Sequence, residues 1–150
     1  MMAILEQVES ELHEARRQRD QLRLRTLGLL KSELVRAGKE PGINGLDGQL
    51  ELRVIRREVK RREEAAQAFN SGGRTVEEAA ERAEAEVLRR YLPAELGQAE
   101  LERLVRIAID EVQASTPRDL GKVMKLATVS VDGRAEPGKV AAIAKRLLGG

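Results

Sequence analysis

The chain has 150 residues, the size of one ordinary domain or of two small ones. It is 41% hydrophobic and 35% charged, which is too apolar for a disordered chain. It has no cysteine and one histidine, His13, which excludes disulfides, zinc fingers, thiol nucleophiles and any Ser-His-Asp triad that does not use His13. Phe69 and Tyr91 are the only aromatic residues, so the apolar content favours packed helices over a β-sandwich.

Hydrophobic residues recur with a helical period through residues 1–93, which predicts an α-helical N-terminal domain of long helices. Asp20 is placed to cap a second helix that ends near Gly38. Residues 38–48 contain a proline and four glycines and are expected to form a loop. A third helix then ends at 71–73.

A fourth helix begins at Thr75, which has Glu78 at the spacing of a capping box. Pro93 is expected to end this helix, because the residue before a proline avoids the helical region. Residues 91–97 therefore mark the boundary to a second domain.

Residues 94–150 predict a three-helix bundle. Its second helix opens at Thr116, with a proline at the first helical position and Asp119 at the third. The run 128–131 (Thr-Val-Ser-Val) is the one strand-like segment, and its β-branched residues predict an early end to that helix. The fold class is all-α: a long-helix N-terminal domain followed by a three-helix C-terminal bundle.

The net charge of +2 averages over unlike sections. Residues 74–111 carry 6 Lys/Arg and 10 Asp/Glu (−4), whereas residues 112–150 carry 7 and 3 (+4). In this basic tail the candidate nucleic-acid-binding residues are Lys122, Lys125, Arg134 and Lys139. Glycines at 121 and 138 lie beside lysines near helix starts, where backbone N–H groups can meet a phosphate. Close packing of helices is the alternative reason for a glycine at those positions.

A second basic run, 53–62, places Arg53, Arg57, Lys60 and Arg61 on one side of the third helix. It is either a solvated face paired to Glu58, Glu63 and Glu64 or a docking surface. Adjacent carboxylates on such charged helices are typical of a surface.

The pattern predicts no catalytic residue, no cofactor and no metal site. No signal-peptide pattern and no run of roughly 20 apolar residues is present, so we expect a cytoplasmic protein without membrane contact. Two aromatics cannot form a base-stacking platform. Any nucleic acid bound is therefore expected to be a folded RNA, recognised by its shape and backbone.

Three strings in series carry a family resemblance: Val-Ile-Arg-Arg-Glu-Val-Lys-Arg-Arg at 54–62, Glu-Val-Leu-Arg-Arg-Tyr-Leu-Pro at 86–93, and Asp-Leu-Gly-Lys-Val-Met at 119–124. The last is followed by Gly-Arg-Ala at 133–135 and Gly-Lys-Val at 138–140. In order and spacing they resemble the YqeY family, stand-alone relatives of the C-terminal tail of the B subunit of tRNA-dependent amidotransferases. The chain departs from the family pattern at Pro137, which precedes the second Gly-Lys.

The resemblance implies an accessory domain that holds tRNA or a similar folded RNA. The carbon–nitrogen ligase activity associated with the family, with glutamine as amide donor, is then expected only in a complex. The alternative is a protein–protein adaptor whose arginine-rich helices dock an amidotransferase or an aminoacyl-tRNA synthetase.

Overall fold

The computed structural model describes residues 3–149, which contain α-helices and one short 3-10 helix and no strand. Contacts divide the chain into two compact units, Met1–Leu92 and Pro93–Gly150, called here the N-terminal and the C-terminal unit. Within the described residues the predicted all-α fold is confirmed. None of these helices is long and apolar enough to cross a membrane.

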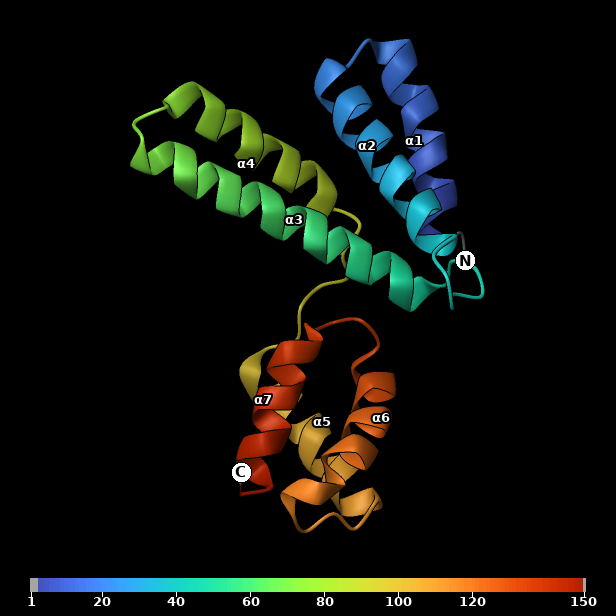
Figure 1. Cartoon of the computed structure of the whole chain (residues 1–150), viewed down its shortest axis with the longest axis vertical. Helices are drawn as coiled ribbons and strands as arrows, with labels where there is room; N and C mark the ends of the chain where they lie inside the picture. The colour runs from blue at the N-terminus through green and yellow to red at the C-terminus, as the bar shows by residue number, and fades with distance from the viewer. Residues whose placement is uncertain (1–2, 150) are drawn as a thin grey trace. The chain divides into compact units, whose positions relative to one another are not determined.

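The N-terminal unit consists of two helical hairpins (Figure 1). Their helices are α1 (Ile4–Gln18), α2 (Gln21–Gly38), α3 (Gly48–Ser71) and α4 (Thr75–Arg89). Asp20 caps α2 as predicted, its carboxylate accepting from the backbone N–H of Arg23. The core is formed by α1, α2, the first half of α3 and the end of α4, and it includes Val8, Leu30, Ile55 and Leu88.

The outer half of the α3–α4 hairpin extends beyond that core (Figure 1). Ala66 is the one buried residue in the described segment 63–83. Arg74 lies over the ring of Phe69, 5.4 Å from its centroid, at the turn between the two helices. This part of the hairpin is therefore held mainly by the packing of α3 on α4.

The start of α4 differs from the expectation. Arg74 is the N-cap and Thr75 is already helical, with no side-chain cap on the helix. The backbone N–H of Arg74 bonds to the carbonyl of Phe69 at 2.9 Å, which closes the turn one residue earlier than a Thr75 cap requires. The carboxylate of Glu78 instead accepts from Asn70 and Arg82. The predicted capping box is therefore wrong.

The end of α4 also lies earlier than predicted. The helix ends at Arg89, and a turn through Leu92 follows, so Pro93 follows the helix end without being its direct cause. Tyr91 in this turn donates a hydrogen bond to the carboxylate of Glu11 on α1.

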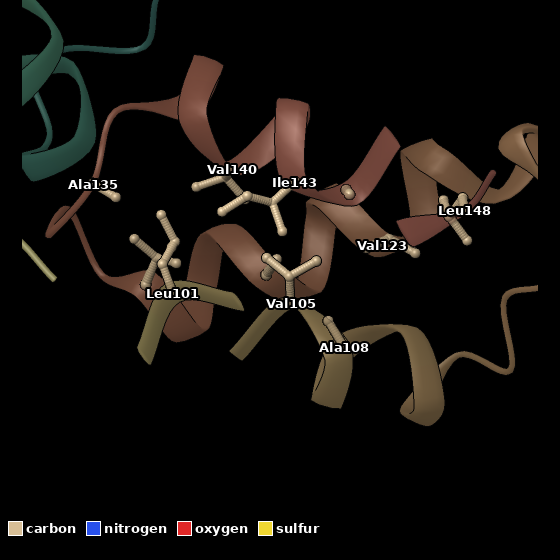
Figure 2. Packing of buried hydrophobic residues seen from close by; sticks show 11 residues of the cluster. Leu101, Val105, Ala108, Val123, Ala135, Val140, Ile143 and Leu148 are labelled. Carbon is tan, nitrogen blue, oxygen red and sulfur yellow. The ribbon is translucent and has the colours of Figure 1, made fainter. Parts of the chain in front are cut away.

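The C-terminal unit packs three helices around one core (Figure 2). They are α5 (Gln98–Glu111), α6 (Leu120–Val131) and α7 (Pro137–Leu147), with a 3-10 turn η1 (Pro117–Asp119) before α6. Leu101 and Val105 of α5 face Val123 of α6 and Val140 of α7 in that core. Thr116 is the N-cap as predicted, and its side chain forms a capping box with Asp119, but the element that it opens is η1 and α6 begins at Leu120.

The expected early end of α6 is wrong, and 128–131 is its last helical turn. Val131 is 2% exposed within the core, and its burial against α5 and α7 outweighs the weak helix propensity of β-branched residues. The hydroxyl of Ser130 donates to the carbonyl of Leu126 at 3.3 Å, which satisfies it inside the helix. Asp132, with φ of 49°, then ends α6 in the left-handed region.

Candidate nucleic-acid interface

The outward face of α6 carries two of the four predicted site residues. Asp119 fixes the start of this helix by accepting from the backbone N–H groups of Ser115 (2.9 Å) and Thr116 (3.2 Å). These two bonds lower the pKa of Asp119 below its ordinary value. Since Val123 points into the core, Lys122 and Lys125 are left exposed on the other side of α6.

Lys122 and Lys125 have no ion-pair partner among residues 3–149. No Asp or Glu lies within α6 itself. Val129, 72% exposed, is the next residue on the same face, one turn after Lys125. The outward face of α6 therefore presents to solvent an apolar side chain and two ammonium groups without an ion pair, of which Lys122 is near enough to Asp119 to help lower the pKa of that carboxyl.

Arg134 and Lys139 lie in the turn before α7 and in its first turn. The Nε of Arg134 donates to the carbonyl of Val131 at 3.3 Å, which directs the side chain along the end of α6. Lys139 forms an ion pair with Glu95 at 3.8 Å, in which both side chains are more than half exposed. Such a pair is weak and leaves the ammonium group able to exchange partners.

The four predicted residues do not form one cluster. Lys122 lies nine residues before the end of α6, which is about 14 Å along the helix axis, and Arg134 and Lys139 follow that end. The structure therefore places them in two groups, Lys122 with Lys125 on the first half of α6 and Arg134 with Lys139 beyond its end.

Acidic side chains of α5 neutralise other cations of the C-terminal unit, which the charge of residues 112–150 alone did not reveal. Glu102 pairs with Arg106 at 2.9 Å and with Arg146 at 3.3 Å, and Glu100 pairs with Arg103 at 2.6 Å. Residues 93–150 together carry 9 Lys/Arg and 8 Asp/Glu, a net charge of only +1. The cations of this unit that form no ion pair within the described residues are therefore Lys122 and Lys125 of α6, Arg118 of η1, Arg134 of the turn to α7 and Lys145 of α7.

The two glycines beside the lysines do not serve helix packing. A Cβ built at Gly121 or at Gly138 meets no atom within 4 Å. The packing alternative for these glycines is therefore wrong. Gly121 is the second residue of α6 and Gly138 the second of α7, where backbone N–H groups have no partner within the helix. Both helix starts leave open space beside the backbone.

No group of three or more His, Asp or Glu side chains within the described part of the chain is arranged to hold a metal ion. His13 is exposed on α1, and Glu63 forms its ion pair with Arg89 of α4. His13 and Glu63 therefore lie at the surface and belong to no metal site among the described residues.

Comparison with protein families supports the resemblance that the strings at 54–62, 86–93 and 119–124 carry. No curated protein matches the sequence. The model of the YqeY-like protein family matches residues 5–148, which is nearly the whole chain and spans both units. The chain therefore belongs to the YqeY-like protein family.

Proposed function

We propose that this protein binds tRNA or a similarly folded RNA through the C-terminal unit. One observation carries the proposal: Lys122 and Lys125 stand exposed and unpaired on one face of α6, while α5 neutralises other cations of that unit. Phosphate groups supply most of the affinity in nucleic-acid complexes, and free Lys side chains are suited to neutralise them.

The mode of recognition follows from the composition of the same surface. Neither aromatic residue belongs to the C-terminal unit, so bases cannot be stacked on an aromatic platform there. Along the axis of α6, Lys122 lies about 14 Å and Lys125 about 9 Å before the helix end, which the cations of the α6–α7 turn follow, so the two groups can contact separate phosphates. Two such points of contact read the shape of a folded RNA rather than a base sequence.

In this proposal the protein supplies RNA binding alone. The carbon–nitrogen ligase chemistry associated with the family takes place on a partner amidotransferase, and this chain presents or retains the tRNA. The purified chain is therefore expected to bind tRNA and to transfer no amide from glutamine to a mischarged tRNA.

A titration of the full chain with total tRNA at several salt concentrations tests the proposal. Four phosphate contacts predict that log K falls with log salt with a slope of roughly −3 to −4. Lys122→Gln with Lys125→Gln should reduce that slope by about 1.4 to 1.8. The matched control is Arg103→Gln with Arg106→Gln, which removes the same charge from ion pairs of α5. Equal effects of the two double variants would contradict a site on α6.

The second candidate is a protein adaptor that docks an amidotransferase or an aminoacyl-tRNA synthetase. The observation behind it is a groove of about 620 Å³ between α2, α3 and α4, lined by Leu29, Ala65 and Ala80 among charged side chains. Leu29 is 50% exposed in it. A pull-down with and without nuclease separates the two candidates, because a docked protein is retained when RNA is digested.

A further inference from the structure

The arginine-rich segment of α3 takes no part in the site on α6. In the structure two carboxylates bind its arginines: Glu33, near the end of α2, and Glu58 of α3 itself. Glu33 of α2 binds Arg36 and lies 3.6 Å from Arg57. Glu58 lies 3.2 Å from Arg61 and 3.0 Å from Arg62. We call these four arginines and two glutamates the arginine cluster: Arg36, Arg57, Arg61, Arg62, Glu33 and Glu58.

The carboxylates of the arginine cluster lie beneath the guanidinium groups. The side chain of Glu58 is 5% exposed, whereas those of Arg57 and Arg61 are 48% and 61% exposed. Arg36 and the positive charges of Arg57 and Arg61 hold the pKa of Glu33 below its ordinary value, so this carboxylate stays ionised. The groups exposed to solvent are therefore the guanidinium groups. Each has five N–H donors, and the carboxylates accept hydrogen bonds from only a few of them.

Two further cations extend the cluster along α3. Arg53 and Lys60 are exposed on the side that bears Arg57, and neither has an ion pair within residues 3–149. Arg62 and Glu58 form a buried pair, which leaves five cations toward solvent (Arg36, Arg53, Arg57, Lys60 and Arg61) against Glu33. Glu40 near Arg36 and Glu64 one turn after Lys60 raise the acidic count to three, so an excess of +2 remains.

The interpretation of this side of α3 as a solvated face paired to Glu58, Glu63 and Glu64 is therefore only partly right. Glu58 is paired, but Glu63 binds Arg89 of α4. Part of the acidic charge expected to neutralise this side of α3 is therefore used elsewhere.

We propose that the arginine cluster, with Arg53 and Lys60, is a second surface of this protein that binds the phosphate backbone of RNA. Arginine forks match phosphate geometry, and carboxylates buried beneath hold those forks in place. Leu29 of α2 lies in the groove that Arg61 and Arg62 also line, but none of the large exposed hydrophobic side chains in the described residues comes from α3. The part of the face that bears Arg53, Arg57 and Lys60 therefore lacks the apolar centre of a protein-binding face. This inference rests on the proposed function, because it holds that the surface on α3 binds the same RNA as the surface on α6.

The experiment compares two double variants of the full chain that remove the same charge from the N-terminal unit. The test variant is Arg53→Gln with Lys60→Gln, and the matched control is Arg16→Gln with Arg19→Gln on α1, where both arginines are exposed. None of the four has an ion pair within the described residues, so thermal unfolding is expected to stay close to wild type. Binding of total tRNA is measured against salt concentration.

We expect the test variant to bind tRNA at least about tenfold more weakly at 0.1 M salt, with a salt slope smaller by about 1.4 to 1.8, and the control to match wild type. Equal behaviour of test and control overturns the inference. In that case a pull-down after nuclease digestion identifies the occupant: if the wild type retains a protein partner that the test variant loses, the face binds an acidic protein instead.

The variant Lys122→Gln with Lys125→Gln, titrated alongside, distinguishes the two surfaces. A loss confined to this variant supports the site on α6 and overturns the inference about α3. A loss confined to Arg53→Gln with Lys60→Gln supports the α3 surface and contradicts the α6 site. Losses in both support both, and a wild-type chain that binds no tRNA at low salt overturns both.

Discussion

The buried ion pair between Glu58 and Arg62 offers a double-mutant cycle whose outcome the structure constrains closely. The two side chains are 5% and 10% exposed, and their atoms Oε1 and Nη1 lie 3.0 Å apart. Glu58→Leu leaves the charge of Arg62 buried, and removing one partner of such a pair costs about 3–5 kcal/mol. The Nη1 of Arg62 keeps its bond to the carbonyl of residue 58 at 3.2 Å, so we expect the lower end, about 3 kcal/mol.

The other two corners of the cycle differ. Arg62→Leu should cost only about 1 kcal/mol, because Glu58 keeps Arg61 at 3.2 Å and Arg57 at 3.9 Å. Replacing both by leucine removes the buried charge altogether and fills the same space, which is often neutral. We expect the double variant to lie within about 1 kcal/mol of wild type, which gives a coupling of about 3–5 kcal/mol.

Urea unfolding followed by far-ultraviolet circular dichroism measures the four variants, since the chain has no Trp and a single Tyr. The transition of the C-terminal unit serves as the internal control and should stay in place, because both residues belong to the N-terminal unit. Additive effects of the two single substitutions would refute the reasoning, as would a Glu58→Leu variant as stable as wild type.

Four further predictions concern single positions. Gly121→Ala should raise stability by about 0.5–1 kcal/mol in thermal unfolding, because the added Cβ meets open space. If this more stable variant binds tRNA more weakly than wild type, a phosphate lies at the glycine. Leu101→Ala, at a site 2% exposed, should cost about 2–5 kcal/mol in the unfolding of the C-terminal unit, and a smaller loss would mean that the core collapses onto the cavity. Burial, with the bond to Glu11, raises the pKa of Tyr91, so ultraviolet titration of this single tyrosine should show a midpoint well above its ordinary value of 10.0. The stability gained from that shift is present below pH 10 and lost as pH rises through the folded pKa; an ordinary titration would contradict it. The pKa of Asp119 is lowered, so its contribution to stability is present above the unfolded value of 3.8 and is lost as pH falls through the folded pKa. The difference in melting temperature between wild type and Asp119→Asn should therefore be present at pH 7 and vanish in acid. A difference that stays constant with pH would exclude this cause.

The helices could be predicted from the sequence because their signals are local. The hydrophobic period marked each helix, and the caps at Asp20 and Thr116 stand where the sequence placed them. The Thr75 cap failed because a backbone bond from Arg74 to Phe69 decides where α4 begins. The β-branched end of α6 failed as a helix stop because burial of Val131 between helices outweighs local propensity.

The surface could be predicted less well, because charge pairing depends on contacts between distant segments. The pair of Glu95 with Lys139 joins residues far apart in the sequence, and the pair of Glu33 with Arg57 joins α2 to α3. Neither follows from spacing along one helix. The free lysines of α6 were nevertheless identifiable, since no acidic residue lies within that helix.

The outer half of the α3–α4 hairpin, with its single buried alanine, has a consequence for local unfolding. Amide hydrogens of residues 63–83 should exchange with solvent by opening of this segment alone, without unfolding of the core around Leu30 and Leu88. Because lengthening a surface loop costs only about 0.6 kcal/mol per doubling of its length, the glycine turn at 72–73 is a place where a foreign sequence can be inserted. A reporter placed there would lie about ten residues along α3 from Arg61 and Arg62 of the arginine cluster.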